Sequence, residues 1–196
     1  MLAKFSYSYQ KKDSNYATSC LQAADKAWKT VSQEEDTPPE LLFYAAGELY
    51  RATGQKKYSK VQEKAAERLP ESVDNGAQTF GTFTYASTKR KIDVELCGKM
   101  LMVLLNRAEE IAACAKDMPY GIGSITTGEQ MQVWWEGVLI ASCNYVITNN
   151  EYGTLTENYA RYFEGINEEA ESLLYRTDEE TAAYLLLLSE MASREL

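Results

Sequence analysis

The chain has 196 residues, of which 45% are hydrophobic and 25% are charged, a balance typical of a globular domain with a buried core. Its net charge of −9 repels phosphate backbones and anionic lipids, so we expect neither nucleic acid nor a membrane as a partner. Histidine is absent, which excludes histidine acid–base catalysis, the Ser-His-Asp arrangement and most catalytic zinc sites.

No apolar run approaches the roughly 20 residues that a membrane-spanning helix needs. The N-terminal segment MLAKFSYSYQKK lacks the apolar core of a signal peptide. We therefore expect either a cytosolic chain or one that begins downstream of its natural start. The cysteines form no CxxC pair and fall in apolar helical stripes, so we expect buried free thiols rather than disulfides or metal ligands. They are Cys20, Cys97, Cys114 and Cys143.

The first predicted helix covers residues 16–31. Apolar side chains recur there every three or four positions, which is the pattern of one buried helix face. Either Asp13 or Ser14 can cap its N-terminus, because a short polar side chain accepts a hydrogen bond from the first turn. We expect the acidic stretch at residues 33–36 to form a solvated loop.

The second and third predicted helices form a hairpin. Residues 37–40 read Thr-Pro-Pro-Glu, in which Thr37 can cap the helix and the prolines suit its first turn. Gly54 ends this helix, since glycine tolerates the left-handed conformation found there. The third helix covers residues 57–68. Because the turn between the two helices is short, we expect them to pack antiparallel.

Two glycine-containing segments separate the remaining helices. We interpret residues 71–87 as an irregular loop, although residues 79–85 could form a short strand, and residues 118–127 as a second loop. The helix at 128–148 is apolar nearly all round, which marks a central helix. Gly165 ends the next helix, and Thr177 or Asp178 can cap the last. These later helices are predicted at residues 89–116, 128–148, 152–163 and 179–194.

The fold class is therefore all-α, with about seven helices in side-by-side hairpins that form an arc or part of a closed toroid. The fixed period of about 34 residues that marks tetratricopeptide repeats is missing. We expect one domain over residues 1–196.

Residues 41–58, LLFYAAGELYRATGQKKY, resemble the helix, glycine turn and helix of glycoside hydrolase family nine, the family of cellulases and endoglucanases. Residues 5–28, 86–100 and 147–172 resemble further stretches of the same domain, in the same order. The resemblance implies an incomplete toroid of the six-hairpin (α/α) type. It also implies a parent activity of β-1,4-glucan hydrolysis with inversion, in a family that is usually secreted by bacteria. The location of this chain stays open.

The catalytic carboxylates of that family have no counterpart here. The chain has no DAGD-like aspartate pair and no His-His-Arg segment. Only a few residues separate Ser172 from the last helix, where the family carries its acid glutamate, and residues 165–167 read Gly-Ile-Asn without the expected arginine. We therefore expect no catalytic residue, no metal and no cofactor. The chain would be either a fragment or a degenerate paralogue.

Three aromatic residues are candidates for substrate binding, because aromatic faces stack on sugar rings. Tyr120 lies in a loop and is the best exposed candidate. Trp134 and Trp135 are neighbours on a helix and point about 100° apart, so core packing is favoured for each. Glu129 and Glu136 lie about 10.5 Å apart along one helix face, slightly long for an inverting pair, and we interpret them as solvated.

Three functions follow from these observations. The first is a hydrolase domain fragment that is inactive alone. The second is a non-catalytic module that binds β-glucan or an oligosaccharide, suggested by the 14 tyrosines and three tryptophans. The third is a helical interaction protein. An open arc of hairpins exposes an apolar edge, so we also expect a homo-oligomer that covers this edge.

Overall fold

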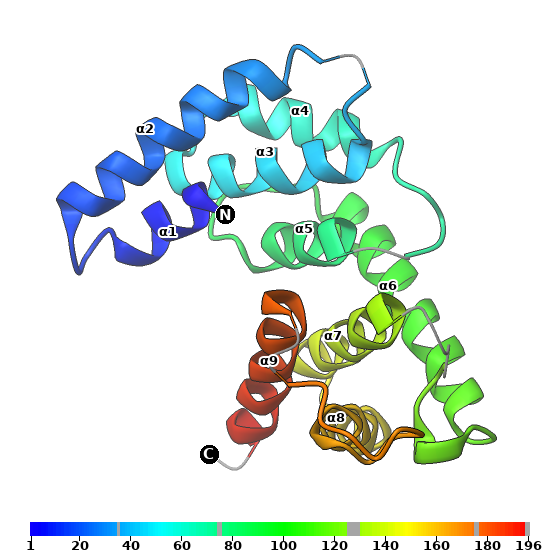
Figure 1. The fold of residues 1–196 in the computed structure, drawn as a ribbon. Helices are drawn as coiled ribbons and strands as arrows, with labels where there is room; N and C mark the ends of the chain where they lie inside the picture. Colours follow the sequence, from blue (N-terminus) through cyan, green and yellow to red (C-terminus); the bar gives the residue numbers. More distant parts are fainter. Residues whose placement is uncertain (35, 74–75, 125–129, 175–176, 195–196) are drawn as a thin grey trace. The chain divides into compact units, whose positions relative to one another are not determined.

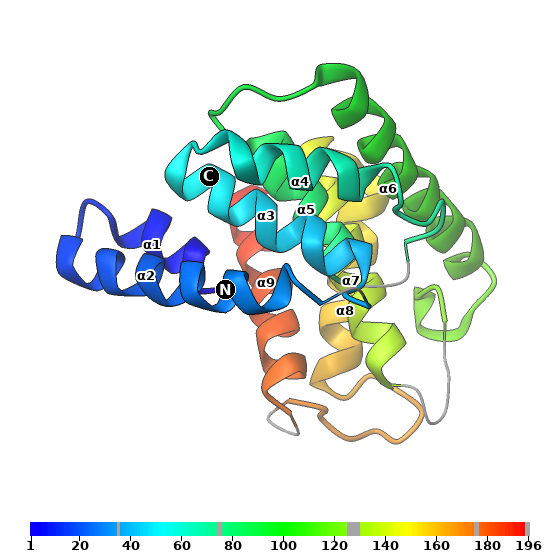
Figure 2. The same cartoon turned by 90° about the horizontal axis from the view of Figure 1, so that it is seen from above.

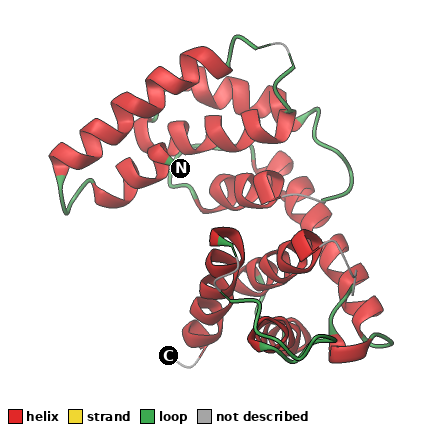
Figure 3. Ribbon diagram, viewed as in Figure 1, coloured by secondary structure: helices red, strands yellow, loops and turns green. Residues whose placement is uncertain are grey.

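The computed structural model describes the chain except for residues 35, 74–75, 125–129, 175–176 and 195–196. The described residues form nine α-helices and one short 3-10 helix, and Figure 3 shows helices and loops throughout them. The all-α prediction is confirmed. The chain divides into two compact units, Met1–Glu71 with Ala77–Leu101 and Ser72–Gly76 with Met102–Leu196. A single domain over residues 1–196 stays a prediction.

The first unit is built from two helical hairpins and the helices that follow them. Helices α1 and α2 form one hairpin and α3 and α4 the other, and the partners lie side by side in both Figure 1 and Figure 2. Helix α1 also packs on α3. The unit contains α1 (Leu2–Tyr9), α2 (Ser14–Val31), α3 (Pro39–Thr53), α4 (Lys56–Ala66), most of α5 (Gly76–Ser87) and the start of α6 (Val94–Ala115).

The predicted helix ends are largely confirmed. The Asp13 carboxylate caps α2 by accepting a backbone hydrogen bond of 2.9 Å from the first turn. Gly54 ends α3 with a φ of 70°. The predicted Thr37 cap is wrong, because its hydroxyl donates to the Val31 carbonyl at 3.0 Å instead. The N-cap of α3 is Pro38, which has extended backbone angles and makes no side-chain cap.

Helix α1 lies where the sequence pattern predicts no helix. Its buried face consists of the small side chains Ala3 and Ser6, so no stripe of large apolar residues announces it. The alternation of serine with aromatic residues in FSYSY obscures the helical period further. The large side chains Phe5, Tyr7 and Tyr9 are exposed.

Helix α5 replaces the irregular loop predicted at residues 71–87, so that prediction is wrong. Glycine and threonine have low helix propensity, but tertiary packing overrides it here. A Cβ at Gly81 would lie only 2.5 Å from the Phe43 ring of α3, so the two helices approach closely at this position. The buried Thr84 hydroxyl donates to the buried Glu48 carboxylate of α3 at 2.8 Å. Small and hydroxyl side chains therefore stabilise α5 against α3.

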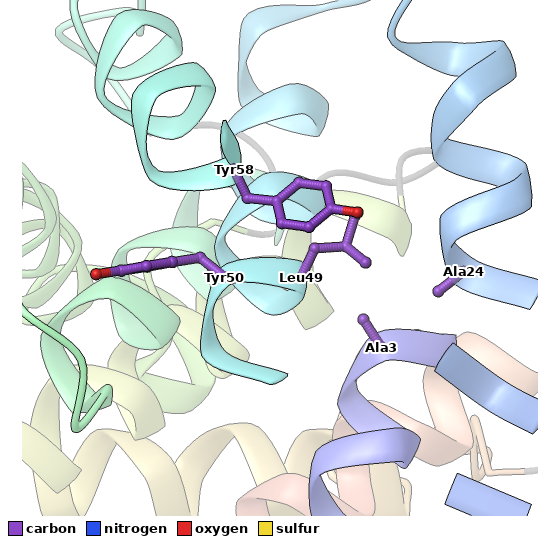
Figure 4. Packing of buried hydrophobic residues seen from close by; sticks show 5 residues of the cluster. All are labelled: Ala3, Ala24, Leu49, Tyr50 and Tyr58. Carbon is purple, nitrogen blue, oxygen red and sulfur yellow. The ribbon is translucent and has the colours of Figure 1, made fainter. Parts of the chain in front are cut away.

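A small apolar cluster joins the two hairpins of the first unit. Figure 4 shows its members, with Ala3 and Ala24 facing each other from α1 and α2. The ring of Tyr58 packs edge-to-face on Trp28 at 5.7 Å, and its hydroxyl donates to Asp25 at 2.6 Å. The cluster consists of Ala3, Ala24, Leu49, Tyr50 and Tyr58.

The second unit is formed by the end of α6 and by three mutually packed helices, α7 (Gln130–Val146), α8 (Asn150–Glu164) and α9 (Asp178–Arg194). Gly165 ends α8 with a φ of 117°, as predicted. Of the two predicted caps for α9, Thr177 is the one used. Its hydroxyl accepts from the Glu180 amide and its own amide donates to the Glu180 carboxylate, both at 3.1 Å. This reciprocal pair is a capping box.

The four cysteines are free, but the prediction that all are buried is wrong for Cys114. Cys20, Cys97 and Cys143 are buried, whereas Cys114 lies on the exposed side of α6, near its end. Among the described residues, every helix is too short or too polar to cross a membrane.

We expect Gly81→Ala to lower the free energy of unfolding by about 2 kcal/mol, because the added methyl would press on Phe43. Gly98→Ala is the matched control, since a Cβ there meets no atom within 4 Å. Alanine at this exposed position of α6 should stabilise the chain by about 0.5–1 kcal/mol. Urea denaturation measures both changes. Equal stabilities of the two variants would contradict the close packing of α5 on α3.

We expect Asp25 to make stability depend on pH. The Tyr58 and Lys29 hydrogen bonds lower the pKa of its carboxyl to about 2. The ionised carboxylate therefore stabilises the folded chain above the unfolded pKa of about 4, and this stability is lost as the pH falls toward 2. Asp25→Asn should be less stable than wild type at neutral pH, with a gap that narrows in acid. Asp117→Asn, at an exposed position, is the control, and an equal gap at both pH values would refute the linkage.

Candidate functional site

The loop between α6 and α7 carries Tyr120. Its backbone has a φ of 62°, and the following Gly121 has a φ of 63°. A left-handed conformation costs a non-glycine residue about 1–2 kcal/mol, so the surroundings must hold this loop in place. The Tyr120 side chain is 40% exposed, and its ring packs edge-to-face on Tyr162 of α8 at a centroid distance of 5.9 Å.

Helix α8 fixes the segment on which Tyr120 sits. The Asn158 side-chain amide donates to the Gly121 carbonyl at 3.0 Å. The Tyr162 hydroxyl donates to the Glu168 carboxylate at 2.9 Å. Burial and this carboxylate raise the pKa of Tyr162 above its usual value, and the hydrogen bond to Glu168 holds the ring in its orientation. Both contacts hold the surroundings of Tyr120 in one arrangement.

Glu136 of α7 is the centre of a buried polar network beneath this loop. Its carboxylate is only 6% exposed and accepts hydrogen bonds from the Tyr159 hydroxyl at 2.8 Å and the Ser124 hydroxyl at 2.9 Å. The Arg107 guanidinium of α6 lies 3.7 Å from its other oxygen. The Tyr159 hydroxyl in turn accepts a hydrogen bond of 3.0 Å from the Gly123 backbone N–H. The carboxylate therefore connects the loop to three helices.

Close packing brings these groups together. A Cβ at Gly137 would lie 3.2 Å from the Tyr159 side chain, so α7 and α8 approach closely beside Glu136. A Cβ at Gly123 would lie 2.7 Å from Ile111 and 3.1 Å from the Glu136 carboxylate. Because Gly123 has no side chain, the loop backbone can approach Glu136 and Tyr159 closely.

The prediction that Glu136 lies on a solvated helix face is wrong, and Glu129 lies outside the described residues. Helix α7 is apolar nearly all round, so it has little solvated face to offer, and Glu136 meets the loop instead of water. Glutamate is almost never buried without partners. A lone acid within an apolar helix is thus the sequence signal that could have revealed the network. Its partners Ser124, Tyr159 and Arg107 carry no such signal.

Trp134 and Trp135, the two tryptophans predicted as candidates for substrate binding, pack on each other. Their rings lie 4.1 Å apart at an angle of 31°, although neighbouring residues leave a helix in different directions. Trp134 is buried, as core packing requires. The Trp135 indole is half-buried and covers Gly76, where a Cβ would lie 1.5 Å from the ring. Tyr120 is the most exposed of the three candidates, and substrate binding by any of them stays a prediction.

The chemistry of this site favours contact over proton transfer. The described Asp, Glu and Cys side chains form no cluster of three or more that could hold a metal. Glu136 already accepts two hydrogen bonds and faces a guanidinium, which leaves its carboxylate committed to the protein. The Tyr120 ring is the exposed aromatic group of this site.

No protein-family model and no curated protein matches the chain. Solved structures of endoglucanases do. A metagenome-derived glycoside hydrolase family 9 endoglucanase is similar with a TM-score of 0.77 and 21% identity, over 90% of this chain and 37% of that one. The family 9 endoglucanase J30 gives 0.75 and 20%, over 87% and 36%.

A thermostable endoglucanase variant from Alicyclobacillus acidocaldarius is similar with a TM-score of 0.74 and 20% identity, over 87% of this chain and 37% of that one. The chain thus spans little more than a third of the length of each of these structures. At such identities the similarity is one of fold. The predicted fold, an incomplete toroid of helical hairpins of the six-hairpin (α/α) type, is confirmed.

Proposed function

We propose that the chain is part of a cellulase-like glycoside hydrolase and does not hydrolyse glycosidic bonds by itself. The observation that carries this proposal is the similarity of fold to endoglucanases over 90% of the chain. The sequence resemblance at residues 41–58 independently supports the same family. Because a fold hosts more than one activity, the residues decide what the chain can catalyse.

The inactivity follows from the carboxylates. Inverting hydrolysis needs a base and an acid about 6.5–9.5 Å apart with a water molecule between them. The sequence has no DAGD-like pair to supply the base, and it has no histidine to replace either group. Glu136 and Glu48 are buried and hydrogen-bonded within the protein, which suits neither role.

A second function, non-catalytic binding of β-glucan or an oligosaccharide, is favoured by Tyr120. Its exposed ring packs on Tyr162, so little side-chain entropy is lost when a sugar stacks on it. A neutral glucan is also compatible with the net charge of −9.

We expect the purified chain to release no reducing sugar from carboxymethylcellulose. It should nevertheless bind cellopentaose weakly, at millimolar concentration, in calorimetric titrations. Tyr120→Asn should abolish this binding, since asparagine removes the ring and tolerates the left-handed backbone. Tyr145→Asn, at a tyrosine that is 72% exposed on α7, is the matched control.

Turnover within the ordinary enzyme range of about 1–10³ s⁻¹ would refute the inactivity. Equal heats of binding for the Tyr120 and Tyr145 variants would remove Tyr120 from the proposed site. The absence of binding by the wild type would refute the glucan-binding function as a whole.

We also propose that the chain self-associates through the exposed apolar surface of α1 and the start of α2. Large apolar and aromatic side chains gather there, and they are enriched at protein interfaces. A second copy of the chain that covers them would remove this apolar surface from water. The exposed residues are Met1, Leu2, Phe5, Tyr7, Tyr9 and Tyr16.

Light scattering should therefore give a mass above the 22.1 kDa of the monomer, rising with concentration. The double variant Phe5→Ser, Tyr9→Ser removes two neighbouring rings, whose centroids lie 6.4 Å apart, and should return the mass to the monomer. Leu185→Ser, at an exposed apolar residue of α9, is the control. A wild type that stays monomeric at high concentration would contradict self-association.

A further inference from the structure

The loop that carries Tyr120 is attached to the protein by a small number of identifiable contacts. Ile122 is fully buried and anchors the loop by its apolar side chain. Among the described residues of the loop, three make polar attachments to the helices: the Gly121 carbonyl accepts from Asn158, the Gly123 amide donates to Tyr159 and the Ser124 hydroxyl donates to Glu136.

Two of the three polar attachments end on the same atom. The Gly123 amide reaches Glu136 through the Tyr159 hydroxyl, which accepts from the amide and donates to Oε2 of the carboxylate. The Ser124 hydroxyl donates directly to that oxygen. We call this chain of hydrogen bonds, from the Gly123 amide through Tyr159 to Glu136, the relay. Burial and the nearby carboxylate raise the pKa of Tyr159 well above its usual value, which favours the protonated hydroxyl that donates to Glu136.

We propose that Glu136 is a positioning residue, which through Tyr159 and Ser124 holds the loop in the conformation that presents Tyr120 to a glucan. The role in binding rests on the function proposed above. The hold on the loop rests on the geometry alone.

The backbone of Tyr120 supports this assignment. A non-glycine residue adopts the left-handed region only when its surroundings impose it. The attachments at Gly121, Gly123 and Ser124 follow directly after Tyr120 and fix the chain on its C-terminal side. Loss of the relay would let the backbone of Tyr120 return to a relaxed conformation, and its ring would leave Tyr162.

Burial of an acid for this purpose has an energetic cost, which argues for a specific role. A buried charge is unfavourable unless it is paired and hydrogen-bonded, and a well-packed apolar side chain is often as stable. Arg107 supplies the opposite charge, and it also contacts Glu110 at 3.1 Å, so its guanidinium is itself held in place.

The decisive variant is Tyr159→Phe, which removes one hydroxyl and breaks the relay. Tyr152→Phe is the matched control, since Tyr152 is an equally buried tyrosine of α8 whose hydroxyl donates to Glu109, away from the loop. Amide hydrogen exchange measured by NMR reports on the Gly123 N–H directly. Calorimetry with cellopentaose reports on Tyr120.

We expect Gly123 exchange to accelerate by about tenfold in Tyr159→Phe relative to Tyr152→Phe at equal global stability. Cellopentaose affinity should fall by about fivefold in Tyr159→Phe. Glu136→Gln keeps an acceptor for both hydroxyls and should retain slow exchange, whereas Glu136→Ala should not.

Equal Gly123 exchange in Tyr159→Phe and Tyr152→Phe would overturn the positioning role. So would an unchanged cellopentaose affinity in Tyr159→Phe. If the wild type binds no cellopentaose, the glucan-binding function fails, and the exchange measurement still decides whether Glu136 holds the loop.

Discussion

The buried carboxylate of Glu136 is the constraint on which the candidate site depends. An acid within an apolar helix must find hydrogen-bond donors and an opposite charge, because its burial is otherwise too unfavourable. It finds them in Tyr159, Ser124 and Arg107, which come from α8, the loop and α6. By satisfying one side chain, the chain fixes the position of three separate segments. The left-handed backbone of Tyr120 is a consequence of this arrangement.

The first unit also contains a buried carboxylate with hydrogen-bond partners, that of Glu48. Glu48 is buried on α3 and accepts from the Thr84 hydroxyl at 2.8 Å and from Arg51 at 2.6 Å. The Thr84 contact joins α3 to α5, a helix whose own sequence scarcely favours helical structure. Arg51 also lies over the ring of Tyr7 at 4.8 Å, which attaches α1 to the same centre. In each unit, a buried acid thus specifies how weakly predicted segments pack.

Local signals explain which parts of the fold could be predicted. Asp13, Gly54 and Gly165 act at helix ends through neighbouring backbone atoms, so sequence alone indicated them. Helix α5 could not be predicted, because its stability comes from contacts with α3 that lie far away in the sequence. The Glu136 network escaped for the same reason. Only Glu136 is unusual in the sequence, as an acid within an apolar helix. Its partners Ser124, Tyr159 and Arg107 have no distinguishing pattern in the sequence, because only the fold brings them together.

These observations separate the scaffold from the chemistry. The hairpins are held by capping residues, by glycines at close approaches such as Gly81 and Gly137, and by buried acids with their partners. None of these contacts involves the aspartate pair or the acid glutamate that the resemblance leads one to expect. The endoglucanase-like fold, over little more than a third of the length of those structures, is thus stabilised by contacts of other kinds. Because the residues that stabilise a fold and those that catalyse a reaction are different sets, this fold alone does not determine what the chain can catalyse.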